Sequence, residues 1–391
     1  MYYAIYYNGG LKMKTIKQFL EELLRDIGVN ISIDKNDIDV AKIFLNRINQ
    51  YLYQSNNNEY ISPFHEYWKE KHQEILNISI NRNQARKIAE IFEQIFSSPS
   101  SFPQLELNTK ITNTKGLSKE NIANVRFYTA IQDFKINIYK DGRNPFQKYL
   151  EKPEWFEPEK IVESPNIILE FLEYLGATGS QGDKRIKWML EASKFLLETC
   201  NGQAYNLLEI CNNDLELVRK LISDERDIGF SRKKADMFIR DMLDWNIWDT
   251  DIGIEKLNVA SDTNTIRVAL RTGLLELDFP LLASYLDVYC YQYGLVDYKT
   301  QEGWRTVWEE WKKIPNNHCP KTPASMDYLI YKSIGKKYCK LNKRKCEECV
   351  LNQVCPPDKR NLKPPRSISI YGQTGWESGK TDAGGGGGIM S

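Results

Sequence analysis

The segment Cys339–Cys355 reads CKLNKRKCEECVLNQVC and holds four of the eight cysteines of the chain. Its spacing, Cys-x6-Cys-x2-Cys-x5-Cys, puts four sulfurs on one short loop. Structural zinc takes four thiolates, and a [4Fe-4S] cluster takes one thiolate at each iron. Because thiols stay reduced in a reducing compartment, the crowding predicts a metal centre rather than disulfides. Spacing alone leaves both metals open, and the predicted ligands are Cys339, Cys346, Cys349 and Cys355.

Basic residues surround the first of these cysteines. Residues 332–345 contain seven bases and no acid: Lys332, Lys336, Lys337, Lys340, Lys343, Arg344 and Lys345. Alone, such a run is typical of a solvated face. On a rigid metal-bound loop it predicts a phosphate-binding patch, because each neutralised phosphate releases counterions whatever the base sequence.

Composition sets the outer limits. Of the 391 residues, 41% are hydrophobic and 27% charged, which excludes wholesale disorder and a disulfide-rich scaffold. The length suggests about two or three domains. With 53 basic and 52 acidic residues the net charge is +1, so any surface for a polyanion must come from local clustering. Only three histidines occur, which disfavours a histidine-rich metal centre and a Ser-His-Asp triad.

The chain shows no membrane or secretion signal. No apolar stretch approaches the ~18–20 residues that span a bilayer. The start, MYYAIYYNGG, has neither a basic region nor a small-residue cleavage site. We therefore expect a cytoplasmic protein without a membrane partner, and a monomer.

Hydrophobic periodicity predicts a mainly α-helical fold. Apolar residues recur at helical spacing over residues 16–27, 40–52, 85–96, 167–175, 189–197 and 207–222. Alternating residues are scarce, and Phe134, Ile136 and Ile138 predict one short strand. Residues 99–118 are rich in Ser, Pro, Thr and Asn, which predicts a loop.

These patterns divide the chain into four parts. Residues 1–150 are expected to form a mostly helical accessory domain, and residues 155–335 a helical core. The cysteine loop covers 336–358. Residues 361–391 include five consecutive glycines, which carry too much backbone entropy to order alone, and we expect a flexible glycine-rich tail. The accessory domain or the tail would be the place for a protein partner.

Two segments upstream of the cysteine loop carry further candidate functional residues. Residues 227–239, DIGFSRKKADMFI, place Gly229 and Ser231 just before a helical pattern. Backbone N–H groups in such a turn form an anion site for a DNA phosphate. Residues 259–274, VASDTNTIRVALRTGL, place Asp262 where it also suits the N-cap of a helix.

In this order, the three segments resemble the helix-hairpin-helix (HhH-GPD) DNA glycosylases that carry a C-terminal [4Fe-4S] loop, such as endonuclease III. The cysteine intervals match that family's loop. The hairpin pattern Leu-Pro-Gly-x-Gly-x-Lys-x-Ala is matched at Gly229, whereas Ile228 and Ser231 replace its proline and second glycine. Asp262 matches the family's catalytic aspartate. The resemblance covers about 160–358.

The resemblance implies a two-lobed HhH-GPD glycosylase-like core over 155–335, a [4Fe-4S] cluster with zinc as the alternative, and double-stranded DNA as the partner. It implies cleavage of the N-glycosidic bond of a flipped-out damaged or modified base, with Asp262 stabilising positive charge on the sugar. In the bifunctional branch, a lysine forms a Schiff base at C1′ and permits strand cleavage (AP lyase activity). Lys233 aligns with this lysine, and a register shift of one residue would make it Lys234.

The resemblance also implies contacts to DNA on both flanks of the flipped base, from the hairpin and from the basic loop. Gln181 aligns with a glutamine-bearing loop that fills the hole left by the extruded base. The expected nucleic-acid contacts are Gly229, Phe230, Ser231, Lys234, Gln181, Lys336, Lys337, Lys343 and Arg344.

A second function stays open. A protein that keeps this iron–sulfur scaffold without turnover would be a non-catalytic nucleic-acid-binding or sensing protein, for example in antiviral defence. The two departures in the hairpin, the unmatched residues 1–150 and the glycine-rich tail favour this alternative.

Overall fold

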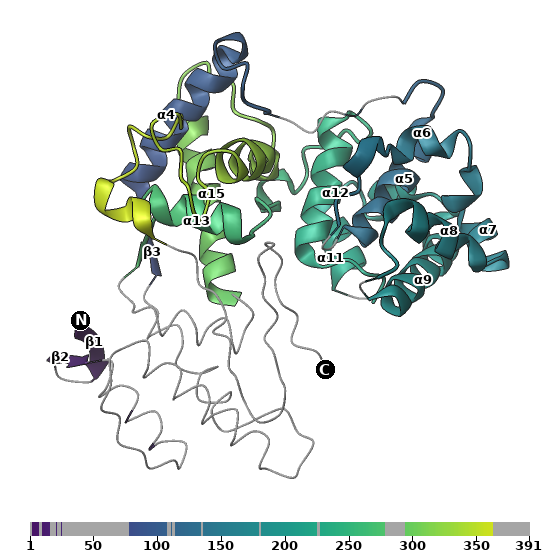
Figure 1. The fold of residues 1–391 in the computed structure, drawn as a ribbon, viewed down its shortest axis with the longest axis horizontal. Helices are drawn as coiled ribbons and strands as arrows, with labels where there is room; N and C mark the ends of the chain where they lie inside the picture. The colour runs from purple at the N-terminus through teal and green to yellow at the C-terminus, as the bar shows by residue number, and fades with distance from the viewer. Residues whose placement is uncertain are drawn as a thin grey trace. The chain divides into compact units, whose positions relative to one another are not determined.

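The computed structural model describes residues 2–7, 10–15, 21, 25, 78–107, 111, 114–133, 136–179, 181–224, 227–277 and 294–362. Over these residues the fold is mainly helical, as the periodicity predicts (Figure 1). The chain separates into two compact units. Unit 1 comprises Met1–Gln84, Ile266–Gly303 and Gln353–Ser391, and unit 2 comprises Ala85–Thr265 and Trp304–Asn352. None of the described helices combines the length and apolar character that a membrane span needs.

Unit 1 holds two antiparallel strand pairs among its described residues. β1 (Tyr2–Tyr7) pairs with β2 (Gly10–Thr15), and β3 (Ile78–Ile80) pairs with β4 (Leu275–Leu277). The second pair continues where the N–H of Asn81 donates to the carbonyl of Leu274 at 2.9 Å. The helices expected over 16–27 and 40–52 lie outside the described residues, apart from single positions, and so does the tail beyond residue 362.

Unit 2 contains a helical core rich in aromatic side chains. It is formed by α5 (Lys119–Gln132), α6 (Pro145–Tyr149), α7 (Pro158–Glu163), α8 (Asn166–Leu175), α9 (Gly182–Cys200), α10 (Leu207–Ile210), α11 (Leu215–Ser223) and α12 (Arg232–Asp244). Phe127 of α5 lies at its centre, with its ring centroid 5.6 Å from that of Phe238 on α12. α8 and α9 confirm two of the expected helices, and the pattern over 207–222 becomes α10 and α11 with a turn between them.

Further helices, which lie wholly or partly in unit 2, precede the cysteine loop. α4 (Arg82–Ser97) confirms the pattern over 85–96 and packs on α15 (Gly294–Lys312), where the rings of Phe96 and Trp311 are 4.9 Å apart. After α15 come the short helix η6 (Pro323–Met326) and the π-helix η7 (Leu329–Lys336). The cysteine loop begins directly after η7.

Two expectations differ from the structure. Residues 85–150 share a unit with 155–265, because α5 and α6 pack into the same core as α8 and α9, so the division expected near 150–155 does not separate compact units. The strand expected over 134–138 does not form over its described residues 136–138, which make a bend and a turn. Ile138 instead enters the helical core from this turn.

Candidate active site

A glycine fixes the hairpin turn before α12. Gly229 has a φ of +83°, and a Cβ atom there would lie 2.8 Å from Ile131 Cγ2 and 2.9 Å from Trp188 Cβ. The hydroxyl of Ser231 accepts a hydrogen bond from the N–H of Lys234 at 3.4 Å and caps α12. The turn is therefore packed against α5 and α9 and leads straight into α12.

The side chain of Lys234 stabilises this turn by binding backbone carbonyl groups. Its Nζ donates to the carbonyl oxygens of Ile131 at 2.6 Å and Gly229 at 3.0 Å, and lies 5.3 Å from the centre of the Trp188 ring. Burial lowers the pKa of Lys234 to about 8. Because its amine is held by two carbonyls, Lys234 supports the turn rather than reaching for a phosphate or a sugar.

Phe230 also points inward. Its side chain is 7% exposed, and its ring packs 4.9 Å from that of Phe127 and 5.9 Å from that of Phe238. The Phe230 ring fills the core beneath the turn, so the contact with nucleic acid expected at this residue would have to be made by its backbone. Ser231 lies exposed at the start of α12.

Lys233 and Asp262 share an electrostatic neighbourhood. Lys233 is half-buried, and its charge acts on Asp327 and Tyr331. The charge of Asp262 acts on the same two side chains. Lys233 on α12 and Asp262 further along the same stretch of unit 2 thus influence one pair of residues, although no hydrogen bond or ion pair between their side chains occurs among the described residues.

Asp262 is also a helix cap. Its Oδ1 accepts from the N–H groups of Asn264 at 2.7 Å and Thr265 at 2.9 Å, at the start of α13 (Thr263–Arg271). In return, the Thr265 hydroxyl accepts from the N–H of Asp262 at 2.8 Å. These hydrogen bonds cap the N-terminal end of the helix. They hold the Asp262 carboxylate in a fixed position.

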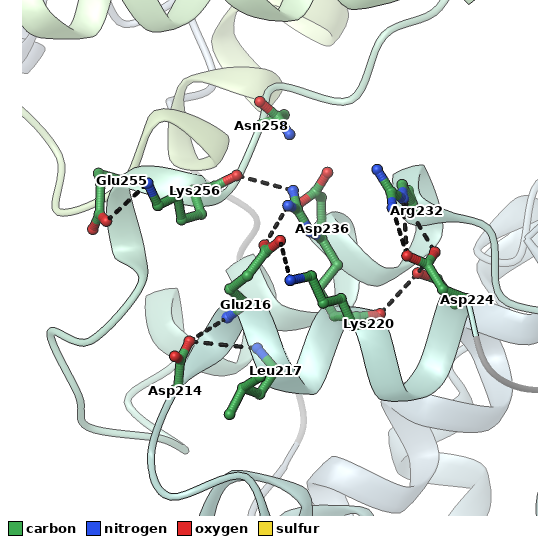
Figure 2. Close-up of polar contacts among 12 residues, drawn as sticks. Asp214, Glu216, Leu217, Lys220, Asp224, Arg232, Asp236, Glu255, Lys256 and Asn258 are labelled. Carbon is green, nitrogen blue, oxygen red and sulfur yellow. Dashed lines mark hydrogen bonds and ion pairs between the residues drawn. The ribbon is translucent and has the colours of Figure 1, made fainter.

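A buried ion pair ties the chain before Asp262 to α12. Asp236, one turn after Lys233, accepts from Arg219 Nη1 at 3.3 Å, and the same Nη1 donates to the carbonyl of Lys256 at 2.9 Å (Figure 2). Burial raises the pKa of Asp236 to about 7, although Arg219 opposes the shift. α11, α12 and the segment at Lys256, six residues before Asp262, are therefore joined into one frame.

The helix that carries Asp327 is fastened to α12. Arg240, two turns after Lys233, donates to Asp327 Oδ2 at 2.7 Å. One turn further, Asp244 Oδ1 accepts from the hydroxyl of Ser325 at 2.7 Å. Both contacts lie on the face of α12 that Lys233 shares, because residues seven and eleven apart return to one side of a helix.

η7 also lies against the turn that holds Asp262. Gly335 approaches Asn264 so closely that a Cβ atom on Gly335 would lie 2.9 Å from Asn264 Cβ. On the same helix, Lys336 Nζ lies 4.3 Å from the centre of the Tyr331 ring. Burial raises the pKa of Tyr331 to about 12, and the negative charge of Asp262 adds to this shift.

Three of the four expected metal ligands, Cys339, Cys346 and Cys349, lie in unit 2 on one loop. The N–H of Lys345 donates to the carbonyl of Tyr338 at 3.0 Å, which closes the loop between Cys339 and Cys346. The N–H of Cys349 donates to the carbonyl of Cys346 at 3.0 Å. Burial raises the pKa of Cys349 to about 11, and the Cys339 and Cys346 sulfurs raise it further.

The donor set fits a thiolate-bound metal in its chemistry. Metal binding displaces the thiol protons, and the metal's positive charge compensates three thiolates that would otherwise repel one another. Cys355 belongs to unit 1, where its carbonyl accepts from Arg360 Nε at 3.3 Å. Over the described residues, no three His, Cys, Asp or Glu side chains form a group ready to hold a metal ion.

Surface positions carry the remaining expected contacts. Lys336, Lys337, Lys343 and Arg344 are exposed, whereas Lys332 of the same run pairs with Glu106 at 2.6 Å. Gln181 is exposed in a left-handed conformation, with a φ of +57°, immediately before α9. A non-glycine residue held this way is strained, and such strain is common at functional loops.

Sequence reasoning missed Asp327, Tyr331 and Arg240. One available signal was the charged stripe of α12, in which Lys233, Asp236, Arg240 and Asp244 recur at helical spacing within an apolar segment. A buried stripe of this kind requires polar partners on another element. The sequence does not say which element supplies them.

The chain matches no protein-family model, and a comparison with characterised proteins finds no significant match.

Proposed function

We propose that this protein is a DNA N-glycosylase with AP lyase activity, built on a helix-hairpin-helix core with a [4Fe-4S] loop. The observation that carries the proposal is the shared neighbourhood of Lys233 and Asp262, whose charges act on the same Asp327 and Tyr331. An amine and a carboxylate around one site are what sugar C1′ chemistry requires.

The chemistry assigns one task to each group. As the N-glycosidic bond breaks, the base departs with the bonding electrons and the sugar becomes positively charged, which the capped Asp262 carboxylate stabilises. Water then adds to the sugar cation and loses a proton, which gives an abasic sugar whose ring opens to an aldehyde at C1′. The amine of Lys233 adds to this C1′ and a molecule of water leaves, giving an imine. The imine acidifies the C2′ proton, and its loss expels the 3′ phosphate. A [4Fe-4S] cluster would be held by Cys339, Cys346, Cys349 and Cys355 and would shape the loop.

DNA contacts follow from the exposed groups. The turn at Gly229 and Ser231 would meet one flank of the duplex, and the exposed bases Lys336, Lys337, Lys343 and Arg344 the other. Gln181, strained and exposed at the start of α9, would fill the space of the flipped base.

Trapping tests the proposal without knowledge of the target base. Wild type is incubated with a duplex containing one abasic site and sodium borohydride, which reduces the imine to a stable protein–DNA adduct. We expect an adduct in wild type and none in Lys233→Ala, with the fold of the variant retained. Lys234→Ala is the matched control, and we expect it to lose stability but keep adduct formation per folded molecule.

The opposite pattern, with the adduct lost only in Lys234→Ala, would move the nucleophile by one residue. No adduct in wild type, on duplex or single-stranded abasic DNA, would overturn the lyase activity. Base release from a panel of damaged duplexes tests the glycosylase step separately. There, Asp262→Asn is expected to abolish release while DNA binding is retained.

One observation favours the second function, nucleic-acid binding without turnover. Phe230 and Lys234 were expected to contact DNA from the hairpin, but the Phe230 ring is buried and the Lys234 amine binds a backbone carbonyl. Their side chains therefore leave fewer groups of the hairpin for DNA. This alternative predicts that wild type binds duplex DNA, forms no adduct and releases no base from the panel.

A further inference from the structure

The carboxylate of Glu106 occupies an anion-binding site on η7. Its Oε2 accepts hydrogen bonds from Lys332 Nζ at 2.6 Å and from the Tyr328 hydroxyl at 3.3 Å. The Lys332 amine also donates to the Tyr328 hydroxyl at 2.6 Å and lies 4.8 Å from the centre of the Tyr328 ring. One cation and one hydroxyl therefore converge on a single anionic oxygen, and such donors bind a carboxylate or a phosphate equally well.

Glu106 belongs to a three-residue segment that lies against η7, the strap Gln104–Glu106. The hydroxyl of Ser333, which is buried, accepts from the N–H of Glu106 at 2.7 Å and donates to its carbonyl at 2.9 Å. Lys337, directly after η7, donates from Nζ to the carbonyl of Gln104 at 2.9 Å. Between these contacts the side chain of Leu105 is buried. The strap is therefore held by its backbone, by one apolar side chain and by one ion pair.

The ion pair of the strap is open to solvent. The Lys332 side chain is 42% exposed and that of Glu106 is 55% exposed. An ion pair between exposed side chains contributes little to stability, because water solvates both charges and salt screens them. Another anion that reaches Lys332 can therefore replace the Glu106 carboxylate.

The surroundings of this site favour the phosphates of a nucleic-acid strand as the competing anion. Lys336 follows Lys332 by about one turn of η7, and Lys343 and Arg344 lie further along the same basic run; all three are exposed. A strand carries one phosphate per nucleotide, so it can meet several of these bases at once, and each neutralised phosphate adds counterion release to the affinity. A free phosphate or a carboxylate meets the Lys332 site alone.

We propose that Lys332 and the Tyr328 hydroxyl form a phosphate site for a DNA strand, which Glu106 fills in the free protein and vacates when DNA binds. Release of the strap also frees Lys337 from the Gln104 carbonyl, so that its amine can meet a second phosphate. The strap is thus an internal competitor that lowers the affinity for DNA. This inference rests on the DNA binding of the proposed function and is independent of its chemistry.

The first test measures the affinity for a fluorescently labelled duplex with one abasic site by anisotropy. Ser333→Ala removes both hydrogen bonds of Ser333 to the strap without changing any charge, and we expect it to bind about threefold to tenfold more tightly than wild type. Ser325→Ala is the matched control, because Ser325 is also buried but its hydroxyl binds Asp244. This variant should bind as wild type does.

A salt series identifies the cation that meets the phosphate. Adding Lys332→Gln to Ser333→Ala should abolish the gain in affinity and reduce the slope of log K against log salt by about one. If Ser333→Ala does not fold, Glu106→Gln replaces it, since it removes the competing charge and should also tighten binding. Its charge control is Glu163→Gln, from a similarly exposed ion pair with Lys160 on α7.

The second test follows the strap itself by hydrogen–deuterium exchange of wild type. The Glu106 N–H is protected by Ser333 in the free protein, so saturation with the duplex should increase deuterium uptake of the peptide that contains the strap. Inorganic phosphate, added at the same concentration of phosphate groups, should leave the uptake unchanged. Release by inorganic phosphate alone would make this a site for a free anion and overturn the assignment to a DNA strand.

The remaining outcomes separate this inference from the proposed catalysis. Uptake that stays the same or falls on duplex binding would overturn the displacement of the strap. Equal affinity of Ser333→Ala and wild type would overturn the competition, and an equal gain in Ser325→Ala would do so too, since it would reflect general loosening. A strap that is released by the duplex in a protein that forms no borohydride adduct would support the phosphate site and refute the lyase activity alone.

Discussion

Replacing Gly229 by alanine tests whether the hairpin turn supports the candidate site. The substitution places a Cβ atom on a residue with a φ of +83° and within 2.9 Å of Ile131 and Trp188. The left-handed backbone costs an L-residue about 1–2 kcal/mol, and forcing a methyl group into tight packing costs about 1–3 kcal/mol more. We expect the free energy of unfolding to fall by about 2–5 kcal/mol.

Gly142→Ala is the matched control for the backbone contribution. Gly142 has a similar φ of +77°, but nothing lies within 4 Å of a Cβ atom built there. This variant should lose only about 1–2 kcal/mol of stability. The difference between the two variants isolates the steric contact of the turn with α5 and α9.

Urea unfolding, followed by tryptophan fluorescence, measures both variants against wild type. Gly229→Ala should also weaken binding to abasic duplex, because the turn that presents Ser231 is displaced. An equal loss of stability in the two variants would show that the turn does not pack against Ile131 and Trp188. Unchanged DNA binding in a clearly destabilised Gly229→Ala would remove the hairpin from the DNA interface.

Three further predictions follow from the frame around the site. Because the pKa of Asp236 rises from 3.8 to about 7 on folding, the native state binds more protons between these pH values, and the free energy of unfolding falls as the pH rises through this window. Urea unfolding measured across this pH range should show a shallower fall of that free energy in Asp236→Asn than in wild type. The same dependence on pH in both proteins would contradict the shift. Gly335→Ala should push Asn264 away and lower the free energy of unfolding by about 1–3 kcal/mol. It should also slow the formation of the borohydride-trapped adduct, because the turn at Asp262 moves together with Asn264. Adduct formation at the wild-type rate would show that η7 does not hold this turn. Protein purified without oxygen should be brown with a broad iron–sulfur absorption band that Cys349→Ser weakens, whereas a colourless protein containing one zinc would replace the cluster by zinc.

Helices were accessible from the sequence because their apolar faces repeat locally. The patterns over 85–96 and 167–175 correspond to α4 and α8, since each places its apolar side chains on one face. The cap at Asp262 was equally local, as its partners lie two and three residues away. Such features need no knowledge of distant parts of the chain.

Contacts between distant segments were not accessible. β3 and β4 are three residues each and pair across nearly two hundred residues of sequence, too short for an alternating pattern to stand out. Asp327 looked like one polar residue in an apolar helix, and its partner Arg240 lies on another helix. The expected strand at 134–138 failed for the converse reason, because an alternating triplet does not form a strand without a neighbour to pair with.

The N-cap of α12 places Lys233 and Lys234 in different surroundings. Ser231 caps α12, so Lys234 is the third helical residue, the position from which a side chain reaches back over the N-terminal turn. An acidic residue there would accept from backbone N–H groups, whereas a lysine has only donors to offer and reaches carbonyls instead, here those of Ile131 and Gly229. Lys233 is rotated by about 100° around the helix from Lys234, so the two amines cannot serve one purpose. The same hydroxyl that begins the helix therefore directs one lysine into the turn and leaves the other for the face of α12 that Arg240 and Asp244 share.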